Sequence, residues 1–178
     1  MEYVDILDEN GNQTGEIASK KEAHQKGLWH KAVHIWAIND KQELLLQRIS
    51  SQKVYSNKWG SSAAGHISTG EDSETAVIRE LSEEIGLELE EKDFEYLFTA
   101  ILRQNDGTII NNEYNDIYLV HINVDINNLK LQKEEVAEVK FMHYKELEEL
   151  VNNRHEDILM KYEEYKRLFE VLHERYDK

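Results

Sequence analysis

Three glutamates at positions 80, 83 and 84 have a spacing that could support metal chemistry. On a helix, positions i, i+3 and i+4 share one face, so these carboxylates would converge. Their repulsion would cost a bare helix about 0.2–0.5 kcal/mol per pair, and a hard divalent cation would reverse that sign. Oxygen-only ligands suit Mg²⁺ or Mn²⁺ better than Zn²⁺. Taken alone, however, such a run more often marks a solvated helix face.

The residues around the cluster favour the functional interpretation. Gly65 and Gly70 precede the helix, where they let the backbone turn sharply or approach a ligand closely. Glu71 and Arg79 could form an ion pair that ties this loop to the helix, which would be a structural role. A chance match to the complete frame of residues has a probability on the order of 10⁻⁸ per starting position. We therefore interpret the glutamates as a metal site.

Residues 65–87 match the pattern G-x5-E-x7-R-E-U-x-E-E-x-G-U, with U aliphatic, at every specified position, and so resemble the Nudix box. The resemblance implies an α/β/α sandwich and hydrolysis of nucleoside diphosphates linked to another group, with Mg²⁺ or Mn²⁺. By position it implies that Glu80 and Glu84 are the principal metal ligands. Glu83 would be a further ligand or would orient the water, and the Gly65 carbonyl would also reach the metal.

A looser resemblance spans roughly residues 20–150. Segments 28–33, 44–48, 59–66 and 109–113 are similar to the isopentenyl-diphosphate isomerase branch of the same superfamily. That branch needs an active-site cysteine where Ala64 stands here. Because protonation of a carbon–carbon double bond requires a placed acid, the methyl group of Ala64 opposes isomerase activity. We predict an isomerase-like Nudix hydrolase, with the isomerase itself and a non-catalytic nucleotide-binding module as alternatives.

The isomerase resemblance also implies three histidines and two glutamates around one metal ion. His24, His30 and His66 could supply the histidines, although the spacing from His24 to His30 is one residue short. Glu113 matches one glutamate, and Asn111 occupies the position of the other. In Nudix hydrolases a distant carboxylate such as Glu113 completes the metal shell or acts as general base; otherwise it would be a solvated strand residue.

The predicted site therefore combines the box with residues outside it. The catalytic residues are Glu83, Glu84 and Glu113, and either Glu83 or Glu113 takes the proton from the attacking water. The metal ligands are Glu80, Glu83, Glu84, Gly65 and Glu113, and the metal is Mg²⁺ or Mn²⁺. The predicted substrate contacts are Arg48, Lys53 and His66, because cations must offset phosphate charge in an acidic protein.

Weaker candidates surround this set. Lys58 and Arg103 are less favoured diphosphate contacts, since most surface cations are simply solvated. A zinc site formed by His30, His34 and His66 is also less favoured, because a lone histidine is more often a hydrogen-bonded structural residue. Trp59 could stack on a base, but a core position is the favoured interpretation.

The elements that position these residues follow from hydrophobic periodicity and turn chemistry. The patterns predict an N-terminal β-hairpin, a mixed sheet and a carboxylate helix capped by Gly86. Together they predict one α/β domain over residues 1–178, with an N-terminal extension at 1–30 and a C-terminal helix within 153–178. Expected strands are 3–7, 16–18, 32–38, 43–49, 94–103, 114–124 and 136–144, expected helices are 20–26, 72–85, 145–152 and 157–176, and 50–62 is expected to be a loop.

The composition and net charge of the chain limit the classes of molecule that it could bind. The net charge of −15 over 178 residues opposes binding to nucleic-acid polymers or anionic membranes, and a small phosphorylated substrate would need a cation. The absence of cysteine excludes disulfides, thiolate nucleophiles and cysteine-based zinc sites. Neither a signal peptide nor an apolar run of about 20 residues is present, so we expect a soluble, cytoplasmic protein. The apolar stripe of the C-terminal helix could also form a homodimer contact.

Overall fold

The computed structural model describes residues 1–53 and 55–177, and within them a seven-stranded mixed sheet forms the centre of the fold. Strands β5-β4-β3-β8-β7 are neighbours in that order, β6 pairs with β3, and β9 pairs with β4. The central pair β3 and β8 is parallel, and the other pairs are antiparallel. The bounds are β3 His30–Ile38, β4 Glu43–Ile49, β5 Trp59–Gly60, β6 Ala63–His66, β7 Phe94–Asn105, β8 Ile110–His121 and β9 Val136–His143.

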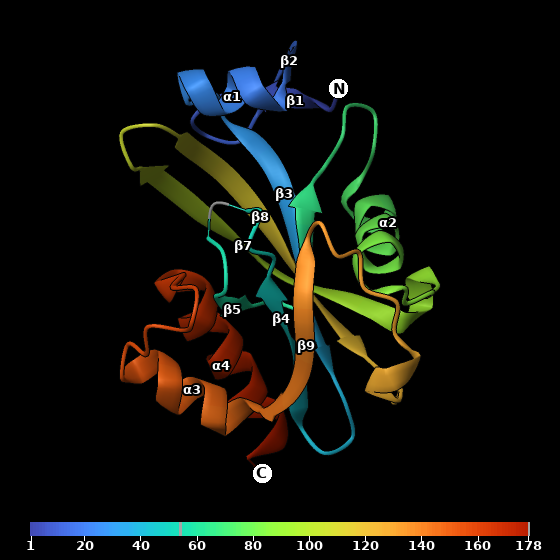
Figure 1. The fold of residues 1–178 in the computed structure, drawn as a ribbon. Coiled ribbons are helices and arrows are strands. Elements are labelled where there is room, and N and C mark those ends of the chain that lie inside the picture. Colours follow the sequence, from blue (N-terminus) through green and yellow to red (C-terminus); the bar gives the residue numbers. More distant parts are fainter. Residues whose placement is uncertain (54, 178) are drawn as a thin grey trace.

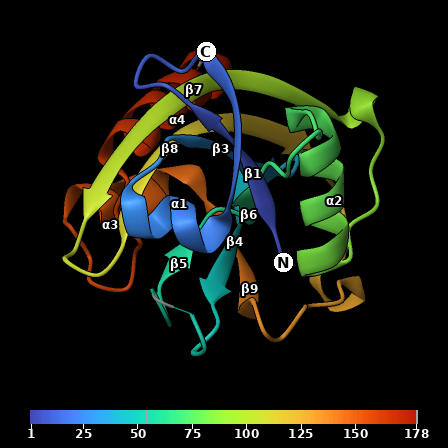
Figure 2. The same cartoon turned by 90° about the horizontal axis from the view of Figure 1, so that it is seen from above.

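Helices cover both faces of this sheet. Helix α2 (Ser73–Ile85) lies on one face, and α3 (Tyr144–Asn152) and α4 (Tyr162–Tyr176) lie on the other (Figures 1 and 2). Because successive side chains of a strand point to opposite faces, β3 supplies both layers. Its Trp36 packs with the α3 and α4 layer, and its Ile35 packs with α2. The architecture is therefore the α/β/α sandwich with a mixed sheet that the sequence predicts.

The N-terminal segment folds as a small unit at one end of the sheet. Strands β1 (Tyr3–Leu7) and β2 (Gln13–Ser19) form the predicted hairpin, and α1 (Lys20–Lys26) follows. Gly27 ends α1 in the left-handed conformation, with φ of 67°, which glycine adopts without steric cost. In Figure 1, α1 lies beyond the end of the sheet at which β3 begins. This placement lets residues of the N-terminal extension, such as Lys20 and His24, line the cavity described below.

Strand β3 divides one of its edges between two partners. Strand β4 pairs with it only at Ala37 and Ile38, and β6 pairs with the stretch from Ala32 to Ile35. The other edge of β3 pairs with β8 along its full length. Strand β6 falls in a segment of small residues whose local pattern does not predict a strand, and its backbone pairing depends on β3. The divergence of β4 and β6 positions the residues described below.

The C-terminal helix differs from the prediction. Helix α4 begins at Tyr162 rather than at Asp157, so the helix expected within 153–178 is shorter than predicted. The physical reason is a competing set of backbone hydrogen bonds. The Trp59 N–H donates to the Asp157 carbonyl at 2.8 Å, and the Leu159 N–H donates to the Trp59 carbonyl at 2.9 Å. Residues 157–159 are therefore extended beside β5. Among the described residues, no helix combines the length and apolarity that a bilayer crossing requires.

Candidate active site and metal centres

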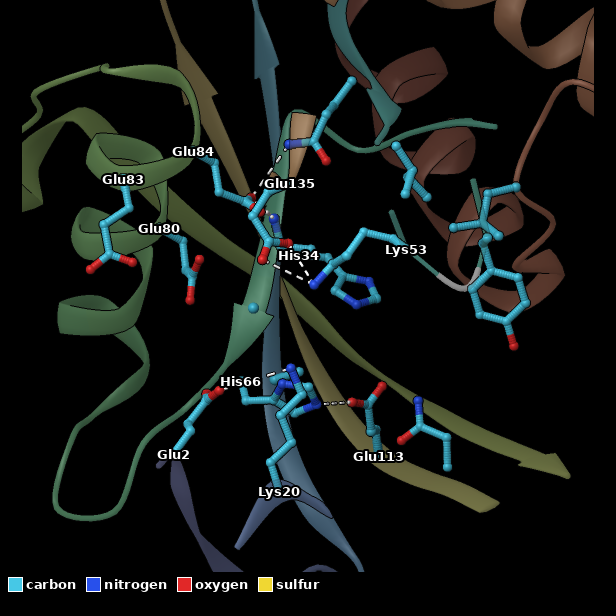
Figure 3. Close-up of a pocket in the computed structure, with 18 of the residues that line it drawn as sticks. Glu2, Lys20, His34, Lys53, His66, Glu80, Glu83, Glu84, Glu113 and Glu135 are labelled. Carbon is cyan, nitrogen blue, oxygen red and sulfur yellow. Dashed lines mark hydrogen bonds and ion pairs between the residues drawn. The ribbon is translucent and has the colours of Figure 1, made fainter. Parts of the chain in front are cut away.

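A cavity of about 660 Å³ lies where α1, α2 and β6 meet the divided edge of β3. Figure 3 shows the glutamates of α2 on one side of β6 and Glu113 with His66 further along the cavity. Six glutamates of the described chain line it, whereas four side chains with fixed positive charge do so. The glutamates are Glu2, Glu80, Glu83, Glu84, Glu113 and Glu135, and the cations are Lys20, Lys53, Arg79 and Lys161.

Helix α2 turns two of its three clustered carboxylates inward. Glu80 and Glu84 are 8% and 5% exposed, whereas the Glu83 side chain is 54% exposed. Glu84 accepts hydrogen bonds from the Ala64 N–H at 2.9 Å and from the Gln47 amide at 3.4 Å. These bonds fix its carboxylate against β6. The predicted convergence of the three side chains on one helical face is therefore present, with Glu83 at the solvent edge.

The glycine before the box helix has a direct steric role. A Cβ atom added to Gly65 would lie 2.0 Å from Glu80 Oε1, so no other residue fits without displacing that carboxylate. The close approach brings the Gly65 backbone next to Glu80. The absence of a side chain at Gly65 therefore lets its backbone carbonyl and carboxylates from α2 lie close enough to contact one bound ion.

The electrostatics of the two buried carboxylates favour a bound cation. Burial raises the pKa of Glu84 to about 8 and that of Glu80 to about 7, in each case against opposing hydrogen bonds. Such pKa values mean that the surroundings supply too little positive charge for two ionised carboxylates. A divalent cation would supply it, and an all-oxygen donor set matches Mg²⁺ or Mn²⁺. The residues present therefore fit the metal that the box implies.

Arg79 forms the predicted ion pair with Glu71. Its guanidinium donates two hydrogen bonds to the Glu71 carboxylate at 2.8 and 2.9 Å, and a third to the His66 carbonyl at 3.0 Å. The Arg79 side chain lowers the pKa of Glu71 by hydrogen bonding. Arg79 also contacts Glu80 at 2.6 Å, an interaction that the sequence pattern does not predict. It thus ties the loop, the strand and the metal-site carboxylate together.

A second cluster lies at the other end of the cavity. His24 of α1, His30 of β3, His66 of β6 and Glu113 of β8 place ligand atoms within 4.8 Å of one another. The three imidazole rings have centroid separations of 5.1–5.3 Å. The strand register explains part of this arrangement, because His30 and Glu113 are direct neighbours across β3 and β8. His24 joins them because α1 packs over the end of the sheet.

The Nε2 atoms of the three histidines in this cluster have no hydrogen-bond partners in the described part of the chain. Nε2 of His30 and of His66 lie 3.3 and 3.0 Å from the Glu113 carboxylate, but neither pair has hydrogen-bond geometry, and Nε2 of His24 is also buried without a partner. Burial lowers the pKa of His24 to about 4, which favours a neutral ligand. Burial opposes ionisation of Glu113, yet contacts with His30 and His66 hold its pKa well below the usual value. A donor set of three imidazoles and one carboxylate suits a divalent transition metal.

The other predicted site residues lie in different surroundings. Lys53 lines the cavity and pairs with Glu135 at 2.8 Å, and His66 lines it as part of the histidine cluster. Arg48 instead pairs with Glu138 at 2.9 Å and is absent from the described residues that line the cavity. Glu113 contacts histidines rather than the glutamates of α2. The structure thus brings together Glu80, Glu83, Glu84 and Gly65, and separately His66 and Glu113.

The weaker candidates lie elsewhere. Lys58 donates a hydrogen bond to the Glu156 carbonyl, and the Arg103 guanidinium lies 5.1 Å from the Trp29 ring. Trp59 is 9% exposed and packs in the core beside α4, which confirms the core interpretation. His34 is not part of the histidine cluster, because its Nδ1 contacts Glu164 at 2.9 Å. A zinc site that includes His34 with His30 and His66 is therefore wrong.

Sequence reasoning overlooked several cavity residues. Lys20, Gln47 and Lys161 line the cavity, but each looks like an ordinary polar residue in its own segment. The contact between His34 and Glu164 joins residues 130 positions apart, and no local pattern carries a signal for it. The missing information is the packing of α1 and of the segment before α4 against β3.

Comparison with known proteins supports the Nudix class that the sequence pattern of residues 65–87 resembles. A family model described as NUDIX domain matches residues 28–162. Nudix hydrolase 3 of Arabidopsis thaliana is 38% identical over 98% of this chain, which spans only 24% of that protein. Isopentenyl-diphosphate Delta-isomerase 2 of Photorhabdus laumondii is 33% identical, with 85% of this chain and 83% of the isomerase aligned.

Solved structures share the fold. The protein DR0079 of Deinococcus radiodurans has a TM-score of 0.72 at 19% identity, with coverage of 93% of this chain and 98% of that one. The NUDIX domain of Shewanella oneidensis NrtR, solved with ADP ribose, has a TM-score of 0.58 at 18% identity, with coverage of 80% and 87%. The fold and the glutamate helix thus define a Nudix-type α/β/α domain. The chain belongs to the NUDIX family, and its relatives include both Nudix hydrolases and isopentenyl-diphosphate isomerases.

Proposed function

We propose that this protein is a Mg²⁺-dependent hydrolase of a small organic or nucleoside diphosphate. The observation that carries the proposal is the pair of buried carboxylates, Glu80 and Glu84, which face the cavity with too little positive charge around them. Arg79 contacts Glu80 but is shared with Glu71, so it leaves the pair undercompensated. A hard cation that bridges to an anionic substrate supplies the missing charge.

In the proposed reaction, the carboxylates of Glu80 and Glu84 and the Gly65 carbonyl would hold a Mg²⁺ ion. Bound there, the ion would supply neutralising charge for the phosphoanhydride and would lower the pKa of a nearby water. The amide of Gln47 and the Ala64 N–H keep Glu84 in place. Glu83 remains partly in solvent and accepts the proton of the attacking water. Glu113, engaged with His30 and His66, acts as a ligand rather than as this base.

The histidine cluster is proposed as a second divalent-metal site. Its support is chemical: buried imidazole nitrogens without hydrogen-bond partners surround one carboxylate oxygen. His24, His30, His66 and Glu113 would hold the ion, and a borderline metal such as Mn²⁺ or Zn²⁺ suits this donor set better than Mg²⁺. The ion would bring positive charge to the end of the cavity opposite the glutamates.

Two relatives support a diphosphate substrate class. One solved NUDIX domain carries ADP ribose, and one relative is named for isopentenyl diphosphate. Both compounds contain a diphosphate linked to an organic group. A cavity of about 660 Å³ is within the ordinary range for small-molecule sites. We propose that the substrate is such a compound and that Lys53 and His66 lie beside it.

The central test replaces Glu84 by glutamine. Glu84→Gln keeps the shape of the side chain but removes a metal-binding charge, so kcat should fall by roughly a hundredfold or more. Phosphate release from a panel of diphosphates, with and without Mg²⁺, measures the effect. Glu74→Gln, an exposed change on the same helix, is the matched control and should leave turnover unchanged. Unchanged turnover in Glu84→Gln would remove the proposed mechanism.

A second candidate activity is isomerisation of isopentenyl diphosphate, which the histidine cluster favours. Ala64 opposes it, because no thiol stands at that position, and Asn111 replaces the second glutamate of that branch. Proton NMR of the substrate with enzyme and divalent metal separates the two activities. A shifted double bond would establish isomerisation, whereas released phosphate with an unchanged double bond would establish hydrolysis.

A further inference from the structure

A buried chain of polar side chains links α4 to the cavity on the side of β3 that carries His34. Glu164 is 4% exposed and accepts hydrogen bonds from His34 Nδ1 at 2.9 Å and from Trp36 Nε1 at 3.1 Å. On the other side of the ring, His34 Nε2 lies 3.3 Å from the Lys161 ammonium. Both His34 and Lys161 line the same cavity as Glu84.

The chemistry of these contacts fixes the direction of each hydrogen bond. Burial would raise the pKa of Glu164, but attraction and hydrogen bonding to His34, with Lys161 and Trp36, hold it below its usual value. An ionised carboxylate only accepts, so His34 Nδ1 carries the hydrogen. The Nε2 lone pair then accepts from the Lys161 ammonium. One of the three ammonium hydrogens is used in this way, and the others remain available.

Lys161 differs from the other cations of the cavity. Arg79 contacts Glu71, Glu80 and Glu83, Lys53 contacts Glu135, and Lys20 lies 3.8 Å from Glu2. Among the described residues, no carboxylate lies within ion-pair distance of the Lys161 ammonium; its polar contact is Nε2 of the His34 imidazole at 3.3 Å. Its charge is therefore less compensated locally than that of the other three.

The strand register places this group next to the glutamate site. His34 pairs across the sheet with Ala64, whose N–H holds Glu84. Gln47, the other donor to Glu84, lines both the main cavity and a smaller adjoining one with Lys161 and Glu164. A diphosphate that is bridged to the glutamates by a cation would therefore have anionic oxygens within the same cavity as the Lys161 ammonium.

We propose that Lys161 binds a non-bridging phosphoryl oxygen of the substrate, and that Glu164 and His34 are positioning residues that hold its ammonium at the cavity. The inference rests on the proposed function, because it assumes a diphosphate ligand. It explains why a carboxylate with no access to the cavity remains buried beside Trp36. Glu164 determines which nitrogen of the His34 imidazole faces Lys161. The His34 imidazole in turn orients the Lys161 ammonium toward the cavity.

The test uses methylenediphosphonate, a diphosphate analogue that cannot be hydrolysed, with the full chain and Mg²⁺ in a calorimetric titration. Lys161→Met should weaken its binding by about tenfold or more, because a charge-assisted hydrogen bond is lost. Lys161→Arg should retain most of the affinity. Lys166→Met, an exposed change of equal charge on α4, is the control and should bind like the wild type.

A double-mutant cycle tests the positioning role. Glu164→Gln presents an amide to His34 and favours the opposite imidazole tautomer, so it should weaken binding several-fold in the wild-type background. In the Lys161→Met background the same change should have no further effect. A merely structural role would give equal losses in both backgrounds and would overturn the positioning claim. Thermal melting of each variant identifies any loss of folding.

The outcomes separate this inference from the proposed function. Wild-type affinity in Lys161→Met would overturn the inference alone, provided that Glu84→Gln still abolishes phosphate release. A wild-type protein that fails to bind the analogue in the presence of Mg²⁺ would overturn the inference as well, and would count against the diphosphate substrate.

Discussion

Individual buried side chains show how charge is distributed in this protein. Glu164 has His34, Trp36 and Lys161 around it, and its pKa is held below the usual value. Glu80 and Glu84 are also buried, yet their pKa values rise to about 7 and about 8. The contrast separates a carboxylate whose compensation is built into the fold from carboxylates that need an external cation.

The histidine cluster yields a prediction about metal affinity. His24→Gln removes one of three imidazoles, so Co²⁺ affinity, followed by visible absorption, should fall by at least about tenfold. His121→Gln, an exposed histidine on β8, should leave the affinity unchanged. Equal Co²⁺ affinity in His24→Gln and wild type would show that the cluster is not a metal site.

Residue positions set by a fixed local spacing could be predicted from the sequence, and contacts created by packing could not. Glu80, Glu83, Glu84 and Gly65 lie together because one loop and one helix hold all of them. Arg48, predicted as a substrate contact, pairs with Glu138 on β9, and a strand position alone does not reveal that partner.

The loop, strand and helix of the box act as one structural piece. Strand β6 carries Gly65, helix α2 carries Glu80, and Arg79 bonds to Glu71 and to the His66 carbonyl. The most direct test of this loop, strand and helix is therefore a substitution at Gly65, whose backbone lies closely against the Glu80 carboxylate.

Replacement of Gly65 by alanine should damage the metal site while leaving the fold in place. The added methyl group would lie 2.0 Å from Glu80 Oε1, so Glu80 must move away. We expect Mg²⁺ affinity to fall by roughly tenfold or more, as measured by Mn²⁺ competition and spin resonance. Gly60→Ala is the control, because its Cβ would meet Leu159 at an ordinary 3.7 Å. Wild-type affinity in Gly65→Ala would contradict the predicted ligand geometry.

Helices and strands whose ends are marked by turn residues or by a capping glycine could be predicted from the sequence. Strand β1, helix α1 and strand β4 have the expected limits, because turn residues or a capping glycine end each of them. Strand β6 and the start of α4 were missed, since both depend on partners distant in sequence. Strand β6 needs β3, and residues 157–159 remain extended because they bond to Trp59.

At the scale of the whole fold, strand β3 connects the histidine cluster with the polar side chains that lead to α4. Its side chains at His30, Ala32, His34 and Trp36 alternate with those that face α2, as expected for a strand. His30 thus belongs to the histidine cluster, and His34 belongs to the chain of polar contacts that reaches Glu164 on α4. The α4 layer therefore contributes both to stability and to the cavity.

This arrangement predicts a pH-dependent part of the stability. The pKa of Glu164 is lower in the folded state than its ordinary value of 4.5, so its ionised form stabilises the fold at neutral pH. That contribution should fade as the pH falls through the ordinary value and then through the folded value. Near neutral pH, Glu164→Gln should cost on the order of 1–3 kcal/mol of unfolding free energy.

Urea unfolding of the wild type and of Glu164→Gln at a series of pH values measures the effect. The gap between the two proteins should narrow progressively as the pH falls below about 5. Glu163→Gln, an exposed neighbour on α4, should show no comparable gap. A gap that stays constant across this range would mean that Glu164 is not the titrating group.

The limits of the family match have a practical consequence. Residues 28–162 would be the natural boundaries for anyone trimming the chain to its recognised domain, and the trimmed protein would keep every glutamate of the box. It would nevertheless lose His24 from one end and Glu164 from the other. Assays of the trimmed protein would measure a cavity that lacks the His24 imidazole and the Glu164 carboxylate behind His34 and Lys161. Weak turnover there would say little about the chain of residues 1–178.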